Sequence, residues 1–405
     1  MSVVSVINNR AWGLLPCALL VLFLTGLISQ AEALARSKRD GQANKKAKGV
    51  RSRVVHIITR DETGRPLKFP SQIFFDPTME ETYVVSGGDK IVVYNSRYFP
   101  IASLGKGRGV EGVNGLYVDP TGMVYVCQAG GPNVPPRISI FNAAFFKVRD
   151  IYFNSIEGLE VDEFVPKTMV ISRDGLFYVV GNARGVLVLN PDGTFSHWLK
   201  PMDRLLRPRN ESEEGGNQTG TVRPQGSPDG EQGPQNEVMR FLPKSLRPSD
   251  TGGGEEAQEE FYTGPVQVTD VEIDSEGHIF ILSEETSKVY IFNAAEEFLY
   301  AIGEKGGSRG KMSRPQAMAI DENRKAIYIT DYMRHTILIY DISGKFMFEF
   351  GGYGTGPGWF QYPKGIAIDR KGNVIIGDFF NQRVQVIGLK FKAQFMLFRS
   401  GPVKK

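Results

Sequence analysis

The C-terminal part of the chain contains one pattern twice, and this repeat limits the possible folds more than any other feature of the sequence. The first copy reads RPQAMAIDENRKAIYITDYMRHTILIYD, and the second reads YPKGIAIDRKGNVIIGDFFNQRVQVIG. Pro315 corresponds to Pro363 and Asp321 to Asp369, so the two copies are 48 residues apart. A period of this size predicts a repeat architecture, in which each unit buries its apolar faces against its neighbours.

Each copy contains short apolar runs that are separated by turn residues. In the second copy the runs are GIAID, NVIIGD and RVQVIG, and a fourth run, KFMFEFG, lies between the two copies. Runs of this length that are rich in Ile and Val predict strands of an antiparallel meander. Four strands in a repeat of this length indicate a propeller blade, and such a blade needs neighbours because it is apolar on both faces.

The same residues resemble the NHL-repeat β-propeller family. The segments PKGIAID and GNVIIGDFFNQRVQVI carry the resemblance, which is strong in the last two repeats and fainter in the earlier ones. It covers most of the chain from about Val54 onward. The resemblance implies a rigid disc of blades whose loops differ from one protein to the next.

The residue that ends the first strand of each repeat marks six repeats in total. These markers are Asp76, Asp119, Ser172, Asp274, Asp321 and Asp369. One step, from Ser172 to Asp274, is about twice as long as the others. We therefore predict an all-β fold, a six-bladed β-propeller with four-stranded antiparallel blades over residues 54–400. An N-terminal strand at 54–59 is expected to close the ring by pairing beside residues 391–398.

The long step contains an insertion at residues 203–262, between blades 3 and 4. Gly, Pro, Gln and Glu dominate it, as in RPQGSPDGEQGPQ and DTGGGEEAQEE, and this composition predicts a disordered segment. Because the insertion joins the outer strand of one blade to the inner strand of the next, we expect it to overhang the mouth of the central channel.

The first 35 residues predict a targeting segment, for which two interpretations remain open. An apolar run at residues 11–28 precedes AEALA at 31–35, which fits a secretory signal peptide. The run is also near the length that spans a membrane, so an uncleaved anchor is the alternative. We thus expect the protein to be exported, periplasmic or extracellular, or else anchored to the membrane by this segment.

Residues 36–53 are expected to form a basic, disordered arm. They contain eight Lys or Arg residues and one Asp, a net charge of +7, and such charge directly after an apolar run resists export. The whole chain carries +3 and residues 1–35 are neutral, so the remainder carries −4. This balance argues against a nucleic-acid-binding surface on the propeller.

Cysteine, histidine and aspartate positions favour structural roles over catalytic ones. Cys127 is alone once the targeting segment is removed, and it is expected to be a small packed residue. Asp331 and Asp378 follow second strands, where turn capping is the expected role. The histidines fall at different positions of the repeat: His56, His197, His278 and His335. We predict no catalytic residue, no metal and no cofactor.

Binding is expected at the loops on one end of the blades, because function in such folds lies in the loops. Arg334 and Arg383 lie in loops of this face and, with two lysines, predict a basic patch that attracts acidic groups. The residues expected to ring the channel mouth begin the first strand of each blade: Ser71, Asn114, Lys167, Thr269, Gln316 and Lys364.

These observations predict an exported or membrane-tethered, non-catalytic scaffold that binds a protein partner, with an acidic partner as a specific candidate. The alternative is an enzyme of the lactonase or lyase type with a metal in its channel, because some propellers that resemble this one are such enzymes. No carboxylate is among the six channel-mouth residues, although Asp270 is adjacent, and two lysines would repel a cation.

Overall fold

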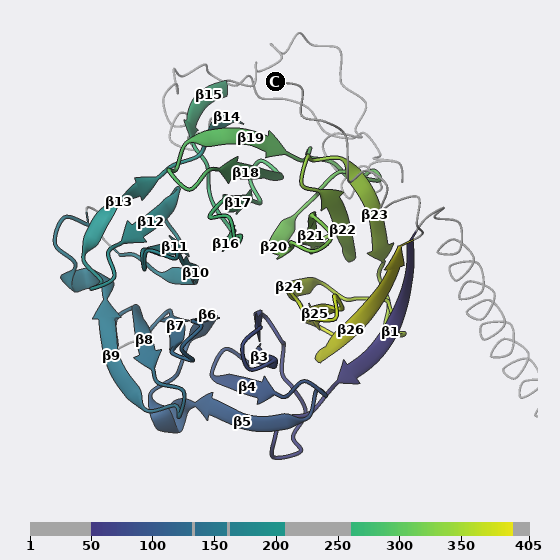
Figure 1. Cartoon of the computed structure of the whole chain (residues 1–405), viewed down its shortest axis with the longest axis horizontal. Coiled ribbons are helices and arrows are strands. Elements are labelled where there is room, and N and C mark those ends of the chain that lie inside the picture. Colours follow the sequence, from purple (N-terminus) through teal and green to yellow (C-terminus); the bar gives the residue numbers. More distant parts are fainter. Residues whose placement is uncertain (1–49, 132–133, 160–162, 207–260, 392–405) are drawn as a thin grey trace, which may run out of the picture. The chain divides into compact units, whose positions relative to one another are not determined.

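The computed structural model describes residues 50–131, 134–159, 163–206 and 261–391. The described strands form six four-stranded antiparallel sheets around a common centre, which confirms the predicted six-bladed propeller (Figure 1). In Figure 1 the strands β6, β10, β16, β20 and β24 lie nearest the centre, and β5, β9, β13, β19 and β23 lie at the rim. Among the described residues, no helix has the length and apolar character needed to cross a membrane.

Every blade is a meander that starts near the centre and ends at the rim. The strands of blades 1–3 are β2 (Ile73–Asp76), β3 (Glu81–Ser86), β4 (Lys90–Tyr94), β5 (Pro100–Gly105), β6 (Val113–Val118), β7 (Val124–Gln128), β8 (Arg137–Phe141), β9 (Lys147–Tyr152), β10 (Pro166–Ile171), β11 (Phe177–Gly181), β12 (Val186–Leu189) and β13 (Phe195–Leu199). Two 3-10 turns follow β5 and β9: η1 (Lys106–Arg108) and η2 (Phe153–Ser155).

Blades 4–6 repeat the same order. Their strands are β16 (Asp270–Ile273), β17 (Ile279–Ser283), β18 (Lys288–Phe292), β19 (Phe298–Ile302), β20 (Pro315–Asp321), β21 (Ala326–Asp331), β22 (Thr336–Asp341), β23 (Phe346–Gly351), β24 (Pro363–Ile368), β25 (Val374–Asp378), β26 (Arg383–Phe391) and, completing blade 6, β1 (Val50–Ile58).

The ring closes through an N-terminal strand, as the sequence predicted. Strand β1 pairs antiparallel with β26, with Val50 opposite Phe391 and Ile58 opposite Val384. The expected register was wrong, because the partner is β26 itself and not the segment 391–398. The C-terminal repeat contributes three described strands to blade 6, so β1 occupies the fourth place in that sheet.

The repeated aspartates hold the turn between the first and second strands. Asp119 accepts backbone hydrogen bonds from Thr121 and Met123, and Asp369 accepts one from Asn373. Four of these turns contain a glycine with a positive φ, +85° at Gly122, which a glycine adopts without strain. In blades 1 and 5 the residues with positive φ are Glu80 and Lys325. The Asp–x–x–Gly pattern of the repeat is therefore explained by local turn geometry.

The core consists of apolar side chains packed between adjacent blades. Ile73, Val84 and Val92 of blade 1 form one buried cluster with Ile375 and Val384 of blade 6. The second and third strands are almost entirely buried, as β11 and β12 show, which explains their continuous apolar runs. Each such buried side chain contributes about 1.5–3 kcal/mol.

Of the described residues, 202–206 and 261–264 belong to a unit distinct from the one that contains the propeller. In this unit β14 (Met202–Leu206) pairs with β15 (Phe261–Pro265), and the Arg204 guanidinium lies 4.2 Å from the centre of the Phe261 ring. The ends of the insertion are thus strands, whereas composition predicted disorder from residue 203 to 262. Residues 207–260, the targeting segment 1–35 and residues 36–49 of the expected arm lie outside the described residues. Residues 50–53 were expected to be disordered, and they are instead part of β1.

Candidate binding face

Two kinds of connection meet at one end of the blades. They are the loops between second and third strands, and the connections that lead from the last strand of one blade to the first strand of the next. In blades 5 and 6 these are residues 332–335, 379–382 and 352–362, and the segment before β2 ends at the same face in blade 1. Side chains from four loops can therefore gather on this face.

Seven ring-bearing residues from these loops form one connected cluster, which we call the aromatic face. The ring of Tyr362 lies 4.5 Å from His335, 4.7 Å from Tyr332 and 5.0 Å from Phe380, centre to centre. Tyr353 is 65% exposed, Phe380 47% and Phe69 41%. The complete set is Phe69, Tyr332, His335, Tyr353, Tyr362, Phe379 and Phe380.

Two buried aspartates position the loops that carry these rings. The carboxylate of Asp331 accepts hydrogen bonds from the backbone of Ser313 (2.7 Å) and Arg314 (3.1 Å). Asp378 accepts one from the backbone of Gln361 (2.7 Å), next to Tyr362. Both side chains are fully buried. Asp331 also accepts a hydrogen bond from the backbone of Arg334 (3.2 Å), which is the predicted capping of its own turn. The bonds from the upstream residues hold the connections between blades beside these loops.

His335 is held in its neutral form within the aromatic face. Its Nδ1 accepts a hydrogen bond from the backbone N–H of Tyr362 (3.0 Å), so its proton lies on Nε2. Burial lowers the pKa of His335 below its usual value, although the carboxylates of Asp331 and Asp378 act in the opposite direction.

Arg334 and Arg383, which the sequence assigned to a basic patch, are engaged inside the propeller. Arg334 forms an ion pair with Glu349 (3.0 Å), and Arg383 forms one with Asp378 (2.7 Å). Their side chains are only 14% and 13% exposed. Arg383 also donates hydrogen bonds to two carbonyl groups of the 352–362 connection. Their charges therefore stabilise the loops.

The six expected channel-mouth residues all lie at or just before the start of an inner strand. Asn114 donates to the carbonyl of Pro166 (2.8 Å), and Gln316 donates to Glu284 (2.6 Å). The hydroxyl of Thr269 donates to the carbonyl of Leu282 (3.1 Å), within blade 4. The remaining three are Ser71, which is partly buried, Lys167, which is exposed, and Lys364, which joins the aromatic face.

The ammonium group of Lys364 lies 4.2 Å from the centre of the Phe379 ring and 5.9 Å from that of Tyr332. The Lys167 side chain is exposed, and no described aromatic ring lies beneath its ammonium group. The structure therefore places one of the two predicted lysines, together with the seven rings, in a single surface.

Two neighbouring acidic side chains on β16, Asp270 and Glu272, were not predicted from the sequence as a pair. Asp270 is 4% exposed and accepts backbone hydrogen bonds from Val271 (3.0 Å) and from Met318 of blade 5 (2.8 Å). Burial raises the pKa of Asp270 to about 7. Burial, followed by the charge of Asp270, raises the pKa of Glu272 well above its usual range.

The signal for this pair was present in the repeat register. At the position of Glu272, the other five inner strands carry apolar or aromatic residues: Phe74, Tyr117, Val170, Ala319 and Ala367. Glu272 also contributes, after burial, to raising the pKa of Tyr117 to about 12. An acid at one of six equivalent positions could thus have been singled out from the sequence.

The described part of the chain offers few residues for a metal site or a reactive thiol. No group of three or more His, Cys, Asp or Glu side chains there could hold a metal ion, and Asp270 with Glu272 supplies two carboxyl groups. Cys127 is fully buried in an apolar cluster, and burial raises the pKa of its thiol. This confirms its prediction as a packed residue.

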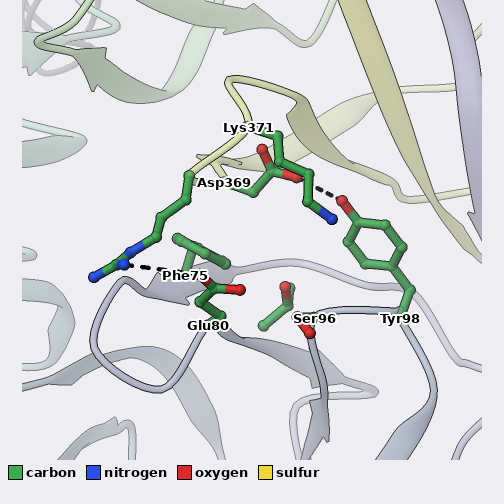
Figure 2. A pocket seen from close by; sticks show the side chains of 8 residues that line it. Phe75, Glu80, Ser96, Tyr98, Asp369 and Lys371 are labelled. Atoms are coloured by element: carbon green, nitrogen blue, oxygen red, sulfur yellow. Dashed lines mark hydrogen bonds and ion pairs between the residues drawn. The ribbon is translucent and has the colours of Figure 1, made fainter.

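A small pocket lies where blade 1 meets blade 6 (Figure 2). Its volume of about 10 Å³ has room for roughly one water molecule. Figure 2 shows the hydroxyl of Tyr98 directed at Asp369, to which it donates a hydrogen bond of 2.6 Å. Arg370 and Glu80 form an ion pair across the same junction (3.7 Å). These contacts join the first blade to the last, which is a structural role.

Comparison with known proteins supports the fold. A family model described as 6-bladed beta-propeller (DUF5128) matches residues 256–344 and 319–394. A comparison with curated protein sequences finds no match. The family match supports a six-bladed propeller. It does not identify the NHL-repeat family within that fold.

Solved structures of similar fold include two from Bacteroides thetaiotaomicron, a structural genomics protein of unknown function and an auxiliary nutrient binding protein. Each is 12% identical with a TM-score of 0.51, and the alignment covers 84% of this chain and 76% of the other. A streptogramin B lyase structure is 10% identical with a TM-score of 0.50, with 85% and 99% covered. At these identities the likeness concerns the fold alone.

Proposed function

We propose that this protein is a non-catalytic, NHL-type propeller that binds a protein partner through the aromatic face. The supporting observation is the exposure of Tyr353, Phe380 and Phe69 in one connected cluster. Exposed aromatic clusters of this kind occur at protein-binding surfaces, where such side chains carry most of the binding energy. The buried carboxylates of Asp331 and Asp378 hold the loops in place, so little conformational entropy is lost on binding.

We also infer that the protein acts outside the cytoplasm or at a membrane. The apolar run and AEALA stretch within residues 1–35 support this part of the proposal. A fold relative described as an auxiliary nutrient binding protein is compatible with a binding role. Sequencing the N-terminus of the native protein distinguishes cleavage after Ala33 or Ala35 from an anchor that keeps Arg10.

Affinity capture from the native envelope tests the binding role. The full chain and a Tyr353→Ala/Phe380→Ala variant are compared after cross-linking, with melting temperature measured for each. Phe146→Ala is the matched control, because Phe146 is at least as exposed but precedes β9, at the strand 3–4 turn of blade 2. The proposal expects a partner that the double variant loses and the control retains. Equal capture by all three proteins contradicts it.

The acid pair on β16 favours a second candidate, an enzyme of the lactonase or lyase type with a divalent cation near the centre. A cation would offset the cost of ionising Asp270 and Glu272. Two carboxyl groups are few for such a site, and the described residues add no third ligand of the His, Cys, Asp or Glu type. Calorimetric titration with Ca²⁺ or Mn²⁺ tests this candidate, which requires binding that Glu272→Gln abolishes.

A further inference from the structure

Lys364 differs from the three arginines near the aromatic face because no ion pair joins its ammonium group to a carboxylate of the described residues. Arg314 pairs with Glu284, Arg334 with Glu349 and Arg383 with Asp378. The ammonium of Lys364 faces the rings of Phe379 and Tyr332 instead, and no carboxylate of the described chain lies within ion-pairing distance. One uncompensated positive charge therefore remains among the aromatic rings.

The surroundings of Lys364 favour a bound anion. Burial lowers the pKa of this ammonium, and the nearby charge of Arg314 lowers it further. A carboxylate in contact with the ammonium would reverse both effects, because an opposite charge favours the ionised form. The contact would also be stronger than one at a fully solvated lysine, since the partly buried pair is less screened.

The rings beside Lys364 form a connected group in which Phe69, Phe379 and Phe380 all contact one another. Five successive contacts of 5.0, 4.5, 5.0, 5.1 and 5.3 Å join the rings of Tyr353, His335, Tyr362, Phe380, Phe379 and Phe69. An extended peptide advances about 3.3 Å per residue, and successive rings of the group are 4.5 to 5.3 Å apart, so more than one residue of such a peptide can contact the group.

The orientation of the rings also favours a peptide over a sugar. The planes of Tyr362 and Phe380 meet at 68°, and those of Phe379 and Phe380 at 81°. Such edge-to-face packing produces ridges and slots that accept apolar side chains. A sugar ring would need a flat exposed face on which to stack. Surfaces lined with aromatic side chains bind extended segments in several families of peptide-recognition domain.

We propose that Lys364 binds a carboxylate of an extended peptide segment in the partner, whose adjacent apolar side chains pack on the aromatic face. The proposal rests on the protein-binding function above and specifies the chemistry that it recognises. The peptide segment carries Glu or Asp next to proline or aromatic residues. Charge and apolar contact act together in this site, so neither polyanions nor apolar polymers alone match it.

Synthetic polymers test this chemistry directly with the full-length protein. The probe is a random copolymer of glutamate and tyrosine, compared with polyglutamate, polyproline and polygalacturonate by surface plasmon resonance. The copolymer is expected to bind best. Lys364→Met should weaken its binding about tenfold, and Lys364→Arg should restore most of it. Lys167→Met is the matched control, because Lys167 has the same strand position in the opposite blade, and it should change binding less than about twofold.

Three outcomes overturn the proposal. They are copolymer binding no tighter than that of polyglutamate, equal effects of Lys364→Met and Lys167→Met, and preferential binding of polygalacturonate, which would identify an acidic sugar. Melting temperatures of the variants show whether each is folded. The protein-binding function is judged separately with the captured partner. If Tyr353→Ala/Phe380→Ala loses that partner and Lys364→Met keeps it, the function stands and the role of Lys364 is refuted.

Discussion

Replacing Glu272 by Gln is expected to stabilise the propeller at neutral pH. Glu272 and Asp270 have pKa values above their usual range because they are buried, so the folded protein binds protons that the unfolded chain has released. The free energy of unfolding must therefore fall as the pH rises from the unfolded pKa values of the carboxyl groups toward their folded values. Gln fills the same volume and cannot ionise.

The size of the effect can be bounded from Asp270. Raising its carboxyl pKa from 3.8 to about 7 corresponds to an upper limit of roughly 4 kcal/mol of destabilisation above pH 7. The Glu272 side chain is less buried than that of Asp270, so replacing Glu272 by Gln should raise the free energy of unfolding by less than this limit. Between the unfolded and the folded pKa of the Glu272 carboxyl, the free energy of unfolding of the wild type depends on pH. In the Glu272→Gln protein this dependence should be smaller by about 1.4 kcal/mol per pH unit, which corresponds to one proton.

Urea denaturation at a series of pH values between about 4 and 8 measures both quantities. Glu276→Gln is the control, because Glu276 lies in the exposed turn of the same blade, where its side chain is 74% exposed. It should leave the slope unchanged. A Glu272→Gln protein that is less stable than the wild type near pH 8, or that keeps the full slope, would show that the carboxyl group ionises freely in the folded state.

Other residues yield predictions that can be checked individually. Asp378→Ala should lower stability by about 3–5 kcal/mol in a denaturation experiment, because it leaves Arg383 without its buried partner. The pKa of His335 is lowered by burial, so stability should be lost as the pH falls below its unfolded value near 6.5, and His335→Gln should reduce this loss; an NMR titration midpoint above 6.5 would contradict the argument. Cys127 should resist alkylation in the native protein and react fully in denaturant, as measured by mass spectrometry.

The fold could be predicted because the repeat period, the apolar strands and the turn residues all indicate the same blade structure. The Asp–x–x–Gly turns recur at a fixed place in the blade, and the hydrogen bonds of Asp119 and Asp369 show why those residues are needed there. Strand β1 could be anticipated from ring closure, but its register could not. The place of the fourth strand depends on where the C-terminal repeat ends, and no turn signal marks that point.

The candidate site was harder to predict because it is assembled from loops of three blades. Arg334 and Arg383 were assigned to a basic patch from their positions alone, and their partners Glu349 and Asp378 become apparent only from side-chain directions. The aromatic face was missed because Phe69 and Phe379 are about 310 residues apart in sequence. Lys364 was predicted from the sequence as a residue of this face, but its aromatic neighbours were not.

Closure of the ring by β1 has a consequence for how the chain folds. Val50 and Phe391 are paired although more than 300 residues separate them. Contacts of such long sequence separation slow folding, because the entropy of closing the loop is lost before the contact can form. Blade 6 can be completed only after nearly the whole described chain has been synthesised. Until then the edge of β26 or of β1 is open to pairing with another chain, so refolding yield should decrease as protein concentration rises.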